Sequence, residues 1–255
     1  MPSTFPTHPA GILPLKLWRP RWFDGVALVL GAASPDIAYL VDGSGLPVWP
    51  LSHQLHGLII FCLPVTLLGC FLVRRAAPAV AAHLPAGGPF ALGDYGALRE
   101  SGHAWWITVT SAVIGAASHL LLDGLEAWFP AIEYPAHLVG LVAMTALAAV
   151  IGRRRLVHRW HGPPPRIARQ PVRFWSVAVA AALPGLAVVP FLPAAFLPHT
   201  TGVRVLTALA VGLLAAAAAT GRAAPQPPTV PAAGPPAAGP PAAGPPAAGP
   251  PAGRT

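Results

Sequence analysis

The sequence predicts an all-α, polytopic integral membrane protein, a helical bundle that begins with a helical hairpin and ends in a disordered tail. The chain has 255 residues, of which 54% are hydrophobic and 9% charged, whereas about a quarter of the residues of a soluble domain are charged. Several apolar runs approach or exceed the ~17–25 residues of a spanning helix. Beyond Arg222 the chain consists of Ala-Ala-Gly-Pro-Pro repeats, which cannot build a core.

Two parts follow from these observations: a multi-helix transmembrane domain over 1–221 and a disordered Ala/Gly/Pro-rich tail over 222–255. Apolar runs occupy 57–73, 104–122, 138–151, 174–197 and 205–220. Together with residues 22–41, these runs predict about six membrane segments, which are preceded by a short helix. Cys62 and Cys70 lie inside one apolar run without a CxxC partner, so we expect lipid-facing or core-facing thiols. No cleaved signal peptide is evident.

The first forty residues are expected to form the helical hairpin. Residues 10–18 are too short to span a bilayer at 1.5 Å per residue. Arg19-Pro20-Arg21 then breaks the chain, and 22–41 is expected to form a second, longer helix that Pro35 interrupts. The rise per residue places His8 ~16 Å and Asp36 ~22 Å from the turn, and therefore at similar depth.

The distribution of basic residues predicts the orientation in the membrane. Lys and Arg gather at 16–21, 74–99 and 153–173 and at Arg222, whereas the connections 41–55 and 123–135 carry acidic residues and no basic one. The positive-inside rule places the basic connections in the cytoplasm. Arg204 is the exception, near an outer helix end where it can snorkel. Topology explains the net charge of +8, so we expect a lipid bilayer as partner and no nucleic acid.

This topology brings five groups to the outer half of the molecule: His8, Asp36, His53, His119 and Asp123. His119 and Asp123 are four residues apart and share one helix face. Each group alone has a structural explanation, such as a polar helix end or an exposed loop side chain. Together, imidazoles and carboxylates suit zinc, manganese or iron, with room for more than one ion.

The order of four motifs carries a resemblance to a known family. Thr7-His8-Pro9, Ser34-Pro35-Asp36, Ser52-His53 and Ser118-His119-Leu120-Leu121-Leu122-Asp123 resemble an uncharacterised bacterial membrane family catalogued as domain of unknown function 4184. That family looks related to inner-membrane proteins described as metal-dependent hydrolases, and more remotely to zinc-dependent phospholipase C. The resemblance covers about residues 2–220. It implies a multi-pass protein of the bacterial cytoplasmic membrane that binds a divalent metal, foremost zinc, through the five groups.

One departure from the family pattern concerns the residues after Asp123. A Thr-His pair often follows the Asp in relatives, but Gly124-Leu125-Glu126 stands here. Glu126 or His137 could replace the missing His, or the site has lost an ion and its catalysis. The histidines at 56, 103 and 199 are candidates of lower rank.

Three functions remain open at this point. The first is a metal-dependent hydrolase that acts on a phosphoester or lipid headgroup at the outer face, with Asp36 or Glu126 as base. The second is an ion-coupled transporter with Asp36 and Asp123 in a proton relay and a helix broken by prolines at 184, 190 and 193. The third is a non-catalytic membrane scaffold. The substrate and the oligomeric state are unknown.

Overall fold

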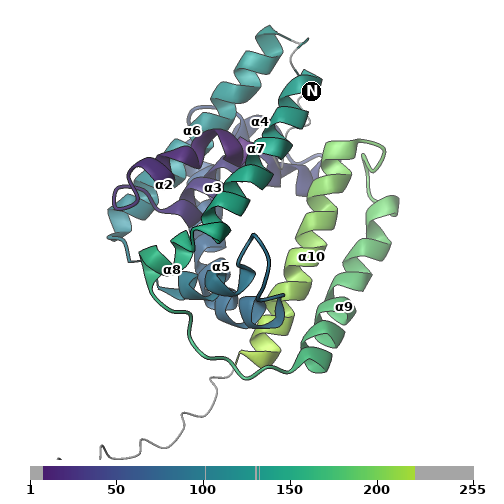
Figure 1. The fold of residues 1–255 in the computed structure, drawn as a ribbon. Helices are drawn as coiled ribbons and strands as arrows, with labels where there is room; N and C mark the ends of the chain where they lie inside the picture. The colour runs from purple at the N-terminus through teal and green to yellow at the C-terminus, as the bar shows by residue number, and fades with distance from the viewer. Residues whose placement is uncertain (1–7, 101, 130, 132, 222–255) are drawn as a thin grey trace, which may run out of the picture. The chain divides into compact units, whose positions relative to one another are not determined.

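The structure is a computed structural model that describes residues 8–100, 102–129, 131 and 133–221. The described residues belong to one compact unit, Met1–Ala224. Their regular elements are all helical, without a strand, as the sequence predicts (Figure 1). The predicted tail, 222–255, lies outside the described residues, and the boundary at 221 stays a prediction.

The described elements comprise α-helices, 3₁₀ segments and one π-helical segment, in this chain order: α1 (His8–Ile12), α2 (Pro14–Trp18), α3 (Gly25–Ala33), η1 (Pro35–Val41), α4 (Val48–Ser52), η2 (Leu58–Cys62), α5 (Leu63–His83), η3 (Leu92–Arg99), α6 (Trp105–Trp128), α7 (Glu133–Arg153), α8 (Leu156–His161), α9 (Pro171–Val188), η5 (Val189–Phe191) and α10 (Pro198–Thr220).

Five helices of the described part are long and apolar enough to cross a membrane. They cover Leu58–His83, Trp105–Trp128, Pro135–Arg153, Pro171–Phe191 and Pro198–Thr220, with 19 to 26 residues each. These correspond to the five predicted apolar runs, and the protein is a multi-pass membrane protein. The sixth predicted segment, 22–41, is not among these five helices of the described part, and it is interrupted at Pro35, as its sequence predicts. It is divided into α3, of nine residues, and η1, of seven.

The N-terminal hairpin is present, and its second limb is interrupted where the sequence predicts. Asp24 begins α3 by accepting hydrogen bonds from the backbone N–H groups of Val26 and Ala27, as an N-cap residue does. The α-helix ends at Ala33, and the chain continues from Pro35 as a 3₁₀ segment, because proline has no N–H to donate to the preceding turn. The break turns the chain just before Asp36.

Close packing of α3 on α6 fixes the centre of the bundle (Figure 1). Gly31 and Gly115 face the partner helix so closely that a Cβ atom on either would lie 2.4 Å from a backbone carbonyl oxygen across the interface. Small residues at such crossings allow backbones in a membrane to approach one another. Cys62 and Cys70 pack beside this interface as buried free thiols and not as lipid-facing ones.

Arg204 does not snorkel, in contrast to the expectation from its position. It is 4% exposed, and its guanidinium donates to the backbone carbonyls of Leu40 (3.2 Å), Asp42 (2.7 Å) and Pro193 (2.6 Å). Arg204 reaches inward because backbone carbonyls at the end of η1 and in the connection before α10 accept hydrogen bonds from its guanidinium. It thereby ties α10, which pairs with α9 (Figure 1), to the segment that carries Asp36.

Candidate metal centre

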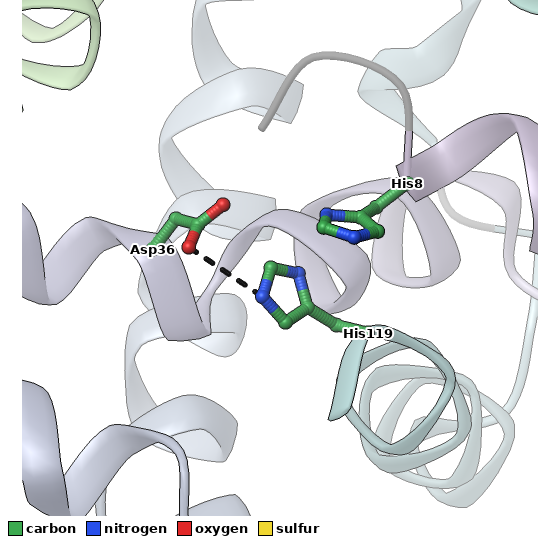
Figure 2. Close-up of side chains that lie close together, drawn as sticks. All are labelled: His8, Asp36 and His119. Carbon is green, nitrogen blue, oxygen red and sulfur yellow. Dashed lines mark ion pairs between the residues drawn. The ribbon is translucent and has the colours of Figure 1, made fainter. Parts of the chain in front are cut away.

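The five side chains predicted to converge come from four separate segments and meet in one cluster. His8 is the first residue of α1, and Asp36 lies in the first turn of η1. His53 follows α4 as its C-cap, and His119 and Asp123 share a face of α6. Figure 2 shows His8, Asp36 and His119 approaching one another from three elements.

The nitrogen and oxygen atoms of the cluster lie at distances typical of neighbouring metal ligands. Nε2 of His119 lies 3.4 Å from Oδ1 of Asp36 and 3.3 Å from Oδ2 of Asp123. Nε2 of His53 lies 3.6 Å and 3.5 Å from the same two oxygens. A tetrahedral zinc ion with bonds of 2.0–2.1 Å would separate its ligands by about 3.3–3.4 Å. The four nitrogen–oxygen separations are therefore of the size expected between neighbouring ligands of such an ion. The ligand atoms that all lie within 4.8 Å of one another form two overlapping groups among the described residues, one of His8, Asp36 and His119 and one of His53, His119 and Asp123.

Hydrogen bonds fix which nitrogen of each imidazole points into the cluster. Nδ1 of His119 lies 2.7 Å from the carbonyl oxygen of Ala32; because a carbonyl only accepts, Nδ1 carries a proton, and Nε2 is the nitrogen that faces the two carboxylates. Nδ1 of His53 lies 2.8 Å from the Ser52 hydroxyl, which itself donates to the carbonyl of Trp49. Such partners orient metal-binding histidines. Within the described part, neither Nε2 has a hydrogen-bond partner.

His8 adds a third imidazole on the other side of Asp123. Its Nε2 lies 3.2 Å from Oδ1 of Asp123, whereas His53 and His119 approach Oδ2. Asp123 therefore contacts three imidazoles through two different oxygens. The ring centroids of His8 and His119 are 4.0 Å apart. This arrangement is compatible with two forms of the site. His8 is a fifth ligand of a single ion, or the carboxylate of Asp123 bridges two ions.

Burial and neighbouring side chains set the charges of His8 and Asp36. Burial lowers the pKa of His8, although Asp123 partly offsets this, so the imidazole is neutral near pH 7. Burial alone would raise the pKa of Asp36, but the imidazoles of His119 and His53 outweigh it and lower the pKa, so the carboxyl is ionised. The side chains of His53 and Asp123, 16% and 18% exposed, form the accessible side.

Glu126, predicted as an alternative base or ligand, is not part of this cluster. It is buried on α6, two turns beyond His119 and ~10.5 Å further along the helix axis. Neither group of ligand atoms that meet within 4.8 Å includes it. His137, the other suggested replacement, lies in α7 and also falls outside both groups. Their predicted roles stay predictions.

The remaining candidate histidines lie elsewhere. His56 is exposed in the turn after α4. His103 contacts Nζ of Lys16 at 3.0 Å. His199 packs its ring against Tyr39, with centroids 4.6 Å apart. None belongs to the groups of potential metal ligands found among the described residues.

A second buried polar cluster, which the motifs did not indicate, surrounds the start of α3. Asp24 pairs with Arg74 and accepts a hydrogen bond of 2.7 Å from the Thr108 hydroxyl, and its backbone N–H donates to the Ser111 hydroxyl at 2.9 Å. Burial would raise the pKa of Asp24, but Thr108 and Arg74 outweigh it and lower the pKa. An Asp directly before an apolar run is a helix-start signal. This signal could have revealed Asp24 as the N-cap of α3, but it does not indicate the ion pair with Arg74.

The comparison with known families supports part of the resemblance. Residues 1–127 match the model of a family described as Domain of unknown function (DUF4184). The matched range contains all five residues of the cluster and ends before α7, whereas the motif resemblance was expected to extend over 2–220. No curated protein and no solved structure matches the chain.

Proposed function

We propose that this protein is a metal-dependent hydrolase of the bacterial cytoplasmic membrane, with a divalent ion, foremost zinc, as its cofactor. The observation that carries the proposal is the set of four separations of 3.3–3.6 Å between the Nε2 atoms of His53 and His119 and the oxygens of Asp36 and Asp123. His8, through the other oxygen of Asp123, completes the ligand set.

The charges of the ligands support a divalent ion at this place. Two carboxylates cancel the two positive charges of the ion, and the imidazoles join as neutral ligands. Buried charges that are neither paired nor bound to metal are costly, and such residues in membrane segments commonly mark functional sites. A bound ion would relieve this cost for the carboxylates of Asp36 and Asp123.

The chemistry that a divalent ion supplies at such a site is Lewis acidity toward a phosphoryl or carbonyl oxygen and activation of water at neutral pH. The chain itself would hold the imidazoles in one tautomer through Ala32 and Ser52. His119, fully buried, would anchor the inner side, whereas His53 and Asp123 border the accessible side. Asp36 and Glu126 are the predicted candidates for the base.

The surroundings of Asp123 support a substrate from the bilayer, such as a lipid headgroup or another phosphoester at the outer face. An apolar hollow of about 320 Å³ runs along the end of α6 on both sides of Asp123 in the sequence, lined by Leu120, Leu121, Gly124, Leu125, Trp128 and Phe129. An acyl chain could lie in this hollow while its headgroup approaches the accessible side of the cluster. The connections without arginine at this end support an outward orientation by the positive-inside rule.

Metal analysis of the full chain in detergent tests the cofactor. Wild type, His119→Ala and His56→Ala are purified in parallel, supplied with zinc and passed through a desalting column, and bound zinc is measured by mass spectrometry. We expect a stoichiometric amount in wild type and in His56→Ala, since His56 is exposed and outside the cluster, and at least a tenfold loss in His119→Ala. A wild type without zinc, or a His119→Ala variant that retains it, contradicts the site.

Hydrolysis is tested separately from metal binding. The zinc-loaded variants are incubated with bis(p-nitrophenyl) phosphate and with phospholipid in mixed micelles, and the products are measured. We expect turnover in wild type and His56→Ala that is lost in Asp36→Asn. Zinc binding without turnover of either substrate contradicts the hydrolase and leaves the scaffold or the transporter as alternatives.

The transporter hypothesis includes a helix broken by prolines. Pro184 lies inside α9 and does not break it, since α9 continues to Val188. The predicted break therefore falls only at the end of α9, toward Pro190.

A further inference from the structure

A large cavity opens at the other end of the bundle, away from the metal cluster. It measures about 820 Å³ and lies between α5, α6 and α10, which contribute Arg74, Thr108 and Leu214, and η3 adds Arg99. This end carries the basic connections, so the sequence predicts that it faces the cytoplasm. Its volume is that of a typical ligand pocket.

The lining of the cavity changes from apolar to cationic along α5. Leu67 and Phe71 contribute apolar surface, and Leu214 contributes it from α10. One to two turns further along α5 the lining becomes Arg74 and Arg75. Such a gradient, from hydrocarbon to cations over about 12 Å of helix, corresponds to the change from the acyl region to the headgroup region of one leaflet.

Three arginines and a hydroxyl group line the polar end, and their charge is only partly balanced. Arg74 pairs with Asp24 through Nη2 alone among the described residues, which leaves other N–H groups as donors. Arg75 is exposed. Arg99 lies 4.0 Å from Glu100, but this ion pair is exposed and therefore weak. The polar end therefore carries net positive charge.

We propose that this cavity binds an anionic phospholipid of the cytoplasmic leaflet, with the lipid phosphate at Arg75 and Arg99 and an acyl chain against Phe71 and Leu214. Guanidinium groups bind phosphate oxygens in a bidentate manner, and basic pockets between membrane helices bind anionic headgroups. The exposed side chain of Phe71, 59% accessible, extends the apolar lining into the bilayer. A soluble phosphate ion would use the arginines but gain nothing from this part of the cavity.

The charge of the site is tested by native mass spectrometry of the full chain in detergent with added phosphatidylglycerol or phosphatidylcholine. The double variant Arg75→Gln/Arg99→Gln is compared with Arg153→Gln/Arg154→Gln, which removes the same charge from exposed arginines outside the cavity. We expect one phosphatidylglycerol bound per chain, about 30-fold more weakly in the cavity variant and unchanged in the control. Equal weakening in both variants, or equal binding of phosphatidylcholine, overturns the proposal.

The apolar part of the site is tested by filling it. Ala218 lines the cavity from an exposed position on α10, so Ala218→Trp fills the space without entering the core. Val211→Trp, on the same helix face two turns away and outside the cavity lining, is the control. We expect at least a tenfold loss of phosphatidylglycerol binding in Ala218→Trp alone. Unchanged binding in this variant, or full displacement of the lipid by millimolar inorganic phosphate, overturns the lipid as occupant.

Discussion

Replacement of Gly115 by alanine tests whether the close crossing of α3 and α6 holds the metal cluster together. A Cβ atom at this position would lie 2.4 Å from the carbonyl oxygen of Leu28 and 2.9 Å from the backbone nitrogen of Ala32. These neighbours are backbone atoms, which cannot rotate away as a side chain can. The two helices must therefore separate to accommodate the methyl group.

The size of the separation follows from the contact distances. An ordinary contact begins at 3.4 Å, so the carbonyl of Leu28 must retreat by about 1 Å from the new methyl group. His119 lies one turn after Gly115 on α6, and its Nδ1 donates to the Ala32 carbonyl of α3 at 2.7 Å. The same displacement would lengthen this bond to about 3.7 Å, beyond hydrogen-bonding distance, and would move Nε2 of His119 relative to Asp36.

Two measurements follow for Gly115→Ala. Loss of an orienting partner typically weakens metal binding 10–100-fold, which competition with a chromophoric chelator can detect. Overpacking costs about 1–3 kcal/mol of the free energy of unfolding. Gly124→Ala is the matched control on the same helix, because a Cβ there meets nothing within 4 Å. Zinc affinity that is unchanged in Gly115→Ala, or equally reduced in Gly124→Ala, would refute the reasoning.

Three further predictions concern buried charges and are measured by thermal or denaturant unfolding in detergent. Asp24→Asn leaves the guanidinium of Arg74 without its carboxylate, and we expect the free energy of unfolding to fall by about 3–5 kcal/mol. Burial lowers the pKa of Lys16 from 10.5 to about 8. Between these two pH values the unfolded chain binds a proton at Lys16 that the folded chain does not, so the free energy of unfolding should rise from pH 8 to 10.5. Lys16→Met should abolish this rise. Arg204→Met removes the donor for three backbone carbonyls, with an expected loss of at least ~3 kcal/mol.

Each of these predictions has a control. Thr108→Ala removes one neutral donor to Asp24 and should cost less than Asp24→Asn; an equal cost contradicts the buried ion pair. A rise in stability above pH 8 that persists in Lys16→Met assigns it to other groups. Arg173→Met, at an exposed position of α9, should leave stability within about 0.5 kcal/mol; a comparable effect at both positions contradicts the role given to Arg204.

The sequence predicted the membrane helices well because their signal is local. Each apolar run is long enough to be recognised without its neighbours, and Pro35 marks the interruption after α3 by its chemistry alone. The division of 22–41 has the same local origin. The residues of α3 are apolar, but the missing N–H of Pro35 changes the helix type after these nine residues.

The sequence by itself determined the membrane class, the five long helices and the set of imidazoles and carboxylates at His8, Asp36, His53, His119 and Asp123, because composition, spacing and charge asymmetry are properties of the chain. Only the tertiary structure decided that these side chains meet within 4.8 Å in two overlapping groups.

The tertiary structure also decided that Glu126 lies outside both groups, that Asp24 pairs with Arg74, and that Arg204 points inward. Such contacts join residues far apart in the chain. They depend on how closely two helices approach each other. Backbone contact at Gly31 and Gly115 sets this distance, and no local sequence pattern specifies it.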